Sequence, residues 1–471
     1  MKQNILRWSV VLVASVLAVS AVSAQETNDV EQLRKELREM RERMQSLEQK
    51  LGSIEAKPAV AVSPVAVTPE TPPVAASVWK PSEPVRVSKG GAYVDVSMVA
   101  TFAAGGSTAS DIQGGTQLGG HDPNQRGFTV QGAELNLQGA VDPYFRGNAN
   151  IVFQLDSGGE SFIELEEAWL ETTSLPGNFQ IRGGQYLTEF GRINTQHPHT
   201  WGFVDAPLVS GRLLGEDGIR NPGVRLSWLA PTPFYSELFF GVQNSQGGTA
   251  ASFRNDHEGA GYLGRIHDAG RVKSVGDMLY SARYAASFDV TDTQTLLAGA
   301  SAVFGPNGSS ANTDTQIYGV DLYWKWKPAN AHAGFPFVSW QTEAMLRKYQ
   351  AGASTTVDLT GDTVADFVPR ETLTDWGMYS QLLWGFKPGW VAGLRGDYVT
   401  HKKLGDYEVL YGADAEREMR WRVSPNLTWY PTEFSKIRLQ YNYDDRDGIG
   451  EDHSVWLQFE FLLGAHAAHK F

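Results

Sequence analysis

The sequence predicts an all-β fold: a transmembrane antiparallel β-barrel of about 16 strands, preceded by an α-helical coiled coil. Three patterns lead to this prediction. The stretch His453–Phe471 alternates apolar and polar residues with a period of 2, as a strand does when its two faces meet different surroundings. Similar short segments recur from Tyr93 onward, separated by turn residues. Ahead of them, Val30–Ile54 carries a strict heptad repeat.

The composition agrees with such a barrel. The 471 residues are 42% hydrophobic and 11% aromatic, and after the N-terminal stretch no apolar run approaches the ~20 residues of a membrane helix. A large soluble all-β protein is the alternative class. Without Cys the fold does not rest on disulfides, and the net charge of -13 argues against a nucleic-acid partner. No nucleophile and base stand in a recognisable arrangement, so we expect neither enzymatic activity nor a cofactor.

Residues 1–24 have the pattern of a signal peptide. Lys2 and Arg7 give a positively charged start, residues 10–22 form an apolar centre, and Ala24 ends a small-residue cleavage site. We therefore expect the mature chain to begin near Gln25, in the periplasm.

Residues 25–56 are expected to form a periplasmic coiled coil. Apolar side chains spaced three and four residues apart in alternation form a seam, with charged residues between them. The seam consists of Val30, Leu33, Leu37, Met40, Met44, Leu47, Leu51 and Ile54. One helix cannot bury such a seam, so it predicts association of identical chains. A lone amphipathic helix is the alternative, and the mixture of Val, Leu and Met does not fix the number of helices.

Residues 57–88 are expected to be a linker. Seven prolines interleaved with Ala and Val favour an extended, semi-rigid polyproline II chain: Pro58, Pro64, Pro69, Pro72, Pro73, Pro81 and Pro84. The coiled coil would then be tethered to the barrel and not packed into it.

Residues 89–471 are expected to form the outer-membrane barrel. Seven short segments with Pro or Asp-rich turn chemistry predict periplasmic turns: 141–144, 174–177, 230–233, 289–292, 327–336, 387–389 and 430–433. Eight longer polar stretches, beginning with 103–126 and ending with 444–452, predict extracellular loops. These fifteen connections join sixteen strands, to within two, and leave both ends in the periplasm.

Individual strands and their ends support this membrane placement. In residues 318–326, Val320 and its parity mates are apolar, whereas Asp321 lies on the opposite parity. Trp390 and Trp429 stand beside expected periplasmic turns, as in an aromatic girdle. A closing strand that ends in Phe471 resembles the terminal assembly signal of bacterial outer-membrane barrels. That resemblance implies outer-membrane lipid and the barrel-assembly machinery as partners.

The third extracellular loop, residues 188–222, is the expected constriction of the lumen. It is long and contains spread apolar residues, which favours folding inward; a surface loop over the barrel mouth is the alternative. The candidate residues for the constriction and for solute contact are Arg182, Arg192, Arg212, Arg220 and Arg225.

Arginines at lumen-facing parity predict a charged wall. The wall candidates are Arg395, Arg420, Arg422 and Arg438, with Arg146, Arg182, Arg225, Arg283 and Arg347 on the same face. Guanidinium groups favour anions in a water-filled lumen. Acidic residues such as Glu343 and Asp397 share that face, so pairing across strands is the alternative to anion preference.

Two other groups of residues offer metal chemistry. His197 and His199 are weak candidates for a metal such as zinc, because a Pro separates them and the chain has no Cys. The acidic group from Glu164 to Glu171 suggests either calcium binding or a solvated face, with the solvated face favoured.

The order of coiled coil, Pro-rich tether and sixteen-strand barrel resembles the trimeric DcaP-like porins. The run Ile181–Tyr186 before the third loop is similar to the strand that enters the constriction loop of the phosphate-selective porins O and P. These resemblances imply a passive, trimeric channel for small hydrophilic solutes in the outer membrane, with the third loop folded inward. The chain departs from the second family because no dense basic ladder occupies neighbouring strands, so phosphate specificity does not carry over.

Two other functions remain open from the sequence. One is a metal-uptake barrel or a TonB-dependent-type receptor, although the pre-barrel segment is too small for a globular plug. The other is a structural anchor whose coiled coil and linker bind peptidoglycan. Conductance would separate them, since a porin conducts openly.

Overall fold

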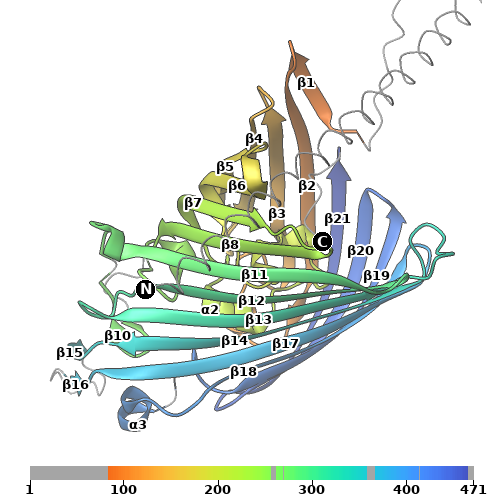
Figure 1. The fold of residues 1–471 in the computed structure, drawn as a ribbon. Coiled ribbons are helices and arrows are strands. Elements are labelled where there is room, and N and C mark those ends of the chain that lie inside the picture. The colour runs from red at the N-terminus through yellow and green to blue at the C-terminus, as the bar shows by residue number, and fades with distance from the viewer. Residues whose placement is uncertain (1–82, 256–260, 269, 358–365, 413, 465–471) are drawn as a thin grey trace, which may run out of the picture. The chain divides into compact units, whose positions relative to one another are not determined.

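In the computed structural model, the structure describes residues 83–255, 261–268, 270–357, 366–412 and 414–464 (Figure 1). The expected signal peptide, coiled coil, most of the linker and Phe471 lie outside these residues and stay predictions. No helix in the described part of the chain has the length and apolar character needed to cross a membrane.

The described residues form a barrel of long strands with short helices in its connections. The barrel strands are β2 (Ala92–Ser107), β3 (Gly127–Ala140), β4 (Phe145–Leu155), β5 (Ser161–Thr172), β6 (Phe179–Leu187), β7 (Arg220–Leu229), β8 (Tyr235–Asn244), β11 (Met278–Thr291), β12 (Gln294–Pro306), β13 (Asp314–Trp326), β14 (Phe337–Ala351), β17 (Glu371–Lys387), β18 (Trp390–His401), β19 (Arg420–Thr432), β20 (Ser435–Arg446) and β21 (Gly450–Leu463). The connections contain β9 (Gly261–Tyr262), β10 (Arg265–Ile266), β15 (Ser354–Val357), β16 (Asp366–Val368), α2 (Leu208–Leu214), α3 (Asp406–Tyr411) and the 3-10 turns Pro176–Asn178, Ile193–Thr195, Pro198–Thr200, Gly248–Ala250 and Val275–Asp277.

Each barrel strand pairs antiparallel with its neighbours in the sequence, and β21 pairs back with β2 to close the ring. Phe102 of β2 stands opposite Phe459 of β21 at this closure. The predicted antiparallel barrel of sixteen strands is therefore confirmed. A short extra strand, β1 (Val85–Lys89), pairs with the start of β2, so the chain becomes a strand just before the expected linker end at residue 88.

All seven segments predicted as short turns fall at connections between consecutive strands. The opposite end of the barrel carries the long connections, with β15, β16 and α3 among them (Figure 1). Two of the eight connections that were expected to be long are short. Only residues 156–160 join β4 to β5, and only residues 447–449 join β20 to β21. There the strands continue through polar residues whose side chains point into the barrel. Asp444, for example, pairs in register with Asp452.

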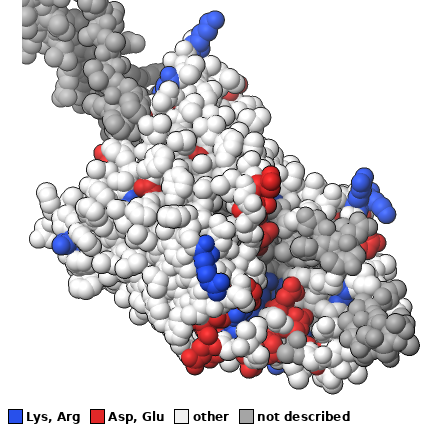
Figure 2. Space-filling model, turned by 180° about the vertical axis from the view of Figure 1, so that it is seen from behind, with Lys and Arg blue, Asp and Glu red and all other residues white. Residues whose placement is uncertain are grey.

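The side chains alternate as a membrane barrel requires. Val320, Leu394 and Leu439 project outward and are about half exposed, whereas their neighbours Asp321, Arg395 and Arg438 point inward and are buried. Much of the surface seen in Figure 2 is accordingly uncharged, and the largest group of charged side chains lies toward one end. An apolar exterior around a polar interior is the inverse of a soluble protein and fits a lipid environment.

The expected aromatic girdle is partly visible at the turn end. The rings of Trp390 and Trp429 stack with centroids 5.9 Å apart, and Tyr430 beside them is exposed. Amphipathic rings at this level suit the boundary between lipid and water.

Candidate functional site: the third loop in the lumen

The third loop, residues 188–219, lies inside the barrel. Its helix α2 places Leu208, Val209 and Leu213 in an apolar cluster in which they have no exposed surface. The wall supplies the other half of the cluster through inward residues of six neighbouring strands: Leu279, Val303, Ile317, Met345, Tyr379 and Val399. Apolar residues on the inner wall have no lipid or core to meet except this loop, so burial holds α2 against β11–β18.

A second anchor joins the loop to β18, β19 and β20. The Asp205 carboxylate accepts hydrogen bonds from Arg395 at 2.6 Å and Arg422 at 3.1 Å. The same carboxylate also accepts hydrogen bonds from the side-chain amides of Gln440 at 2.9 Å and Asn442 at 2.8 Å. Burial alone would raise the pKa of Asp205, but the two guanidinium groups hold it below its ordinary value. This fully buried carboxylate is therefore ionised and satisfied.

A third anchor fixes the start of the loop on β14. The two oxygens of Glu343 accept hydrogen bonds from the backbone N–H groups of Arg192 at 3.0 Å and Ile193 at 2.8 Å. The Tyr379 hydroxyl donates to the same carboxylate. Backbone groups that would otherwise be buried without partners are thus satisfied by the wall.

A fourth anchor uses the histidines of the loop. The His197 ring nitrogens lie 2.8 Å from Glu166 and 3.2 Å from Glu167, and His199 lies 2.8 Å from Glu134. Glu166 and Glu167 both reach the lumen, although they are adjacent in the sequence. A bulge in β5, opposite Asn150 and Ile151, turns these two consecutive side chains inward.

The charge of His197 follows from these contacts. Burial by itself would lower the pKa of His197, but Glu166 and Glu134, with the hydrogen bonds to Glu166 and Glu167, raise it well above its ordinary value. The ring is therefore an imidazolium that docks the loop on β3 and β5. His197 and His199, the sequence candidates for metal binding, occupy ion pairs in this arrangement.

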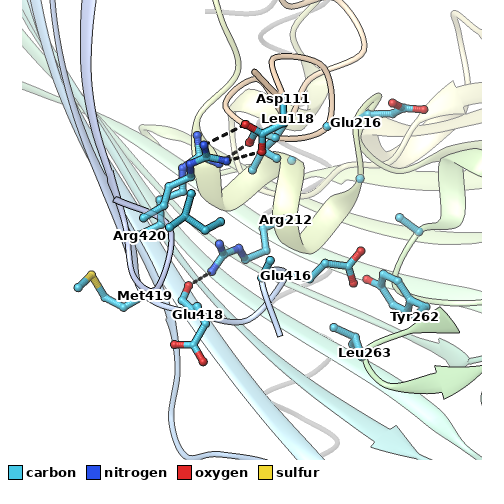
Figure 3. Close-up of a pocket in the computed structure, with 18 of the residues that line it drawn as sticks. Asp111, Leu118, Arg212, Glu216, Tyr262, Leu263, Glu416, Glu418, Met419 and Arg420 are labelled. Atoms are coloured by element: carbon cyan, nitrogen blue, oxygen red, sulfur yellow. Dashed lines mark hydrogen bonds and ion pairs between the residues drawn. The ribbon is translucent and has the colours of Figure 1, made fainter. Parts of the chain in front are cut away.

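Three cavities follow one another past the loop. The outer cavity, of about 480 Å³, opens at the barrel end that carries the long loops. Figure 3 shows Arg212, Glu216, Glu416 and Glu418 around it. A central cavity of only about 40 Å³ shares Gly211, Gly215 and Glu216 with it. The inner cavity, of about 370 Å³, lies toward the end with the short turns and shares Gln196 with the central cavity. The shared lining residues place the small cavity between the two larger ones, and we refer to the three together as the path.

The charges along this path are predominantly acidic. In the outer cavity, Arg347, Arg420 and Arg446 are paired with carboxylates of the wall or of the loop between β2 and β3. Unpaired charges there, among the described residues, are one guanidinium and four carboxylates: Arg212, Glu216, Glu416, Glu418 and Asp447. The central cavity is lined by His121 and three carboxylates and by no Lys or Arg: Glu166, Glu216 and Asp217.

Most sequence-predicted arginines are buried in ion pairs. Arg182 and Arg225 both contact Glu171, and Arg225 also contacts Glu189. Arg395, Arg420 and Arg422 pair with Asp205, Asp397 or Asp444. Arg438 donates instead to the carbonyls of Trp201 and Phe203 in the loop.

The three loop arginines differ in their surroundings. Arg220 is buried and paired with Glu164, whereas Arg192 and Arg212 form no ion pair in the part of the chain that the structure describes. Arg192 stacks on Tyr323 and lines the inner cavity. Arg212 donates to the Glu418 carbonyl at 2.6 Å and lines the outer one (Figure 3). Burial, with Arg420 and Arg347 nearby, lowers the pKa of Arg212 to about 10.

The sequence interpretation missed two features of the site. The acidic residues Glu166, Glu167 and Glu171 are buried in ion pairs instead of forming a solvated face. His121, in the loop between β2 and β3, reaches the third loop and lines the central cavity. A period-2 pattern gives no signal for a bulge, and His121 stands in a loop without a motif.

Comparison with known proteins finds no family model that matches the chain. The crystal structure of the outer membrane channel DcaP of Acinetobacter baumannii is 13% identical and covers 80% of this chain and 99% of its own, with a TM-score of 0.53. An anion-selective porin from Comamonas acidovorans is 7% identical and covers 79% and 100%, with a TM-score of 0.49. The likeness to DcaP shows a porin-like barrel fold.

One curated relative is close in sequence. An uncharacterized protein of Aquifex aeolicus is 32% identical in an alignment of 374 residues, which covers 75% of this chain and 73% of the relative. The chain therefore belongs to the same family as this Aquifex aeolicus protein.

Proposed function

We propose that the protein is an outer-membrane diffusion channel for ions and small hydrophilic solutes, with its short turns toward the periplasm. The observation that carries the proposal is the row of three neighbouring cavities inside a closed barrel, beside a loop anchored to the wall on several sides. The apolar exterior supports the membrane setting, and the DcaP-like fold supports a channel. Because the central cavity holds about 40 Å³, room for only a few water molecules at ~10–15 Å³ each, small permeants suit it best.

The proposed channel prefers cations. An anion preference was expected from the arginines, but the ion pairs of the lumen arginines remove most of that basis. What remains along the path is mainly carboxylate: Glu216 lines both the outer and the central cavity, and Glu416, Glu418 and Asp447 line the outer one. A charge in a narrow, partly desolvated section acts strongly on every passing ion.

Single-channel recording of the purified full chain in planar bilayers tests the function. We expect stepwise insertion of conducting units, and a reversal potential in a KCl gradient that has the sign of cation selectivity. Replacing residues 196–212 by a short Gly-Ser linker should raise the conductance, because it removes the segment between the outer and inner cavities. The matched control replaces residues 157–159 of the short loop between β4 and β5, which should leave the conductance unchanged.

The alternatives predict different recordings. A receptor or a structural anchor would insert without conducting, and a loop outside the path would give equal conductance in the native and linker-replaced proteins. Membrane fractionation complements the recordings, since the proposal places the barrel in the outer membrane and the coiled coil in the periplasm.

A further inference from the structure

The narrowest section of the path contains a histidine whose inner nitrogen has no protein partner. His121 is only 6% exposed, and its Nε2 forms no hydrogen bond among the described residues. This atom points at carboxylates, lying 3.8 Å from Asp217 and 3.9 Å from Glu166, both beyond hydrogen-bond distance. A buried polar atom without a hydrogen-bond partner lowers the stability of the fold. Such an atom often marks a functional role or a bound ion or water.

The other nitrogen of the ring lies between an acceptor and a donor. Nδ1 is 3.2 Å from the Gln131 carbonyl oxygen and 2.7 Å from the Gln154 side-chain nitrogen, an amide donor. In the tautomer that donates from Nδ1 to the carbonyl, for which the Gln154 amide must turn away, Nε2 presents a lone pair. Metal-binding histidines commonly have this arrangement, in which a backbone carbonyl orients the ring from behind.

Carboxylates complete the surroundings of Nε2. One potential ligand atom of each residue, a ring nitrogen of His121 and a carboxylate oxygen of Glu164 and of Asp217, lies within 4.8 Å of the other two. Zn²⁺ holds nitrogen and oxygen ligands at about 2.0–2.2 Å, so these side chains would need to close in by on the order of 1 Å. Glu166 adds a further negative charge beside them.

One internal cation, Arg220, already occupies part of this cluster. Its guanidinium contacts Glu164 and lies 3.4 Å from Glu166 and 3.7 Å from Asp217. Its Nε and one terminal nitrogen nevertheless have no hydrogen-bond partner among the described residues. Glu164, Glu166 and Asp217 all face this one guanidinium, and Glu166 also contacts the His197 imidazolium.

We propose that His121, Glu164 and Asp217 bind a divalent transition-metal ion of the zinc class at the narrowest point of the path. The imidazole favours Zn²⁺, Co²⁺ or Ni²⁺ over Ca²⁺, which takes oxygen ligands. The neighbouring histidine, His197, does not serve this site because its nitrogens are engaged by Glu166 and Glu167. The proposal goes beyond the channel function and concerns equilibrium binding, which needs no conduction.

Titration calorimetry of the full chain in detergent, with Zn²⁺ as the probe, tests the site. We expect one Zn²⁺ per chain for the native protein. His121→Ala should weaken binding by at least about 100-fold, because loss of even an outer partner of a metal ligand typically costs about 10- to 100-fold. His332→Ala, which removes an exposed histidine from a turn, is the matched control and should bind as the native protein does.

Further variants keep the test decisive if His121→Ala folds poorly. Asp217→Asn keeps the shape of the side chain and should also weaken Zn²⁺ binding. Arg220→Gln removes the competing cation and should tighten it, a gain that a purely structural role for the cluster does not predict. With Co²⁺ as the probe, visible absorption should appear in the native protein and not in His121→Ala.

Several results would overturn the site. They are undiminished Zn²⁺ affinity in His121→Ala, equal losses in His121→Ala and His332→Ala, or weaker binding in Arg220→Gln. None depends on whether the barrel conducts, so a failure of the channel proposal would be seen separately in the bilayer recordings.

Discussion

Asp205 of the third loop and Arg395 of β18 are 190 residues apart in the sequence, yet their side chains join at 2.6 Å across the inner wall. Arg395 also donates to Asp397 at 2.8 Å, and Asp397 in turn accepts the backbone N–H of Leu208 at 3.1 Å. Loop and wall therefore form a closed circuit of charge-assisted hydrogen bonds at the start of α2. This circuit positions the helix that narrows the lumen.

The circuit predicts the effect of removing Asp205. Asp205→Ala leaves Arg395 and Arg422 buried with one carboxylate fewer, which should destabilise the barrel by about 3–5 kcal/mol. The freed loop should also raise the single-channel conductance. Thermal unfolding in detergent and bilayer recording measure the two effects. Asp156→Asn, in the exposed loop between β4 and β5, is the control; a native melting temperature and conductance in Asp205→Ala would show that the circuit does not hold the loop.

The strands and turns of this barrel could be predicted because they depend on local patterns. Period-2 alternation identifies a strand between lipid and water, and Pro or Asp-rich segments identify tight turns. The two misjudged loops show the limit of this reasoning. Asp444 and Asp452 look like loop residues in the sequence, but Arg420, Arg422 and Arg446 neutralise them inside the barrel, so the strands continue through them.

The site could be predicted only in part, because it depends on register and on the path of the loops. Parity predicted the lumen side for the arginines, but it could not say which carboxylate each would meet. Glu166 and Glu167 are adjacent in sequence and would point to opposite faces in a regular strand; the bulge in β5 turns both inward. No pattern in the sequence joins His121 to Asp217, which come from two different loops.

A second prediction concerns pH and His197. The pKa of this ring is raised in the folded state, so its ion pairs with Glu134, Glu166 and Glu167 contribute full stability below the unfolded pKa of about 6.5. That contribution is lost as the pH rises through the folded pKa, well above 6.5. His197→Gln should therefore lower the melting temperature more at pH about 6 than at strongly alkaline pH. Melting curves of both proteins across this range check the sign, and an equal difference at all pH values would contradict it.

A third prediction concerns selectivity. Glu216 lines both the outer and the central cavity, so Glu216→Gln should shift the reversal potential toward anions. Arg212→Gln removes the unpaired guanidinium of the outer cavity and should shift it toward cations. Glu160→Gln makes the same charge change as Glu216→Gln in an exposed loop and should leave it unchanged, since salt screens charges beyond about 8 Å. If Glu160→Gln shifts the potential as much as Glu216→Gln, the charges of the path do not set selectivity.

The last prediction concerns assembly through the heptad seam, which lies outside the described residues. Leu37→Asp with Leu47→Asp puts two charges into the seam and should abolish helix association, because carboxylates cannot be buried there unpaired. If the barrel walls also associate, the expected homotrimer should survive but dissociate at a lower temperature in detergent, with its strand content unchanged. Gln45→Asp with Gln49→Asp adds the same charge at outward heptad positions and should dissociate as the native protein does. Equal dissociation temperatures for native and seam-mutated proteins would mean that the coiled coil takes no part in assembly.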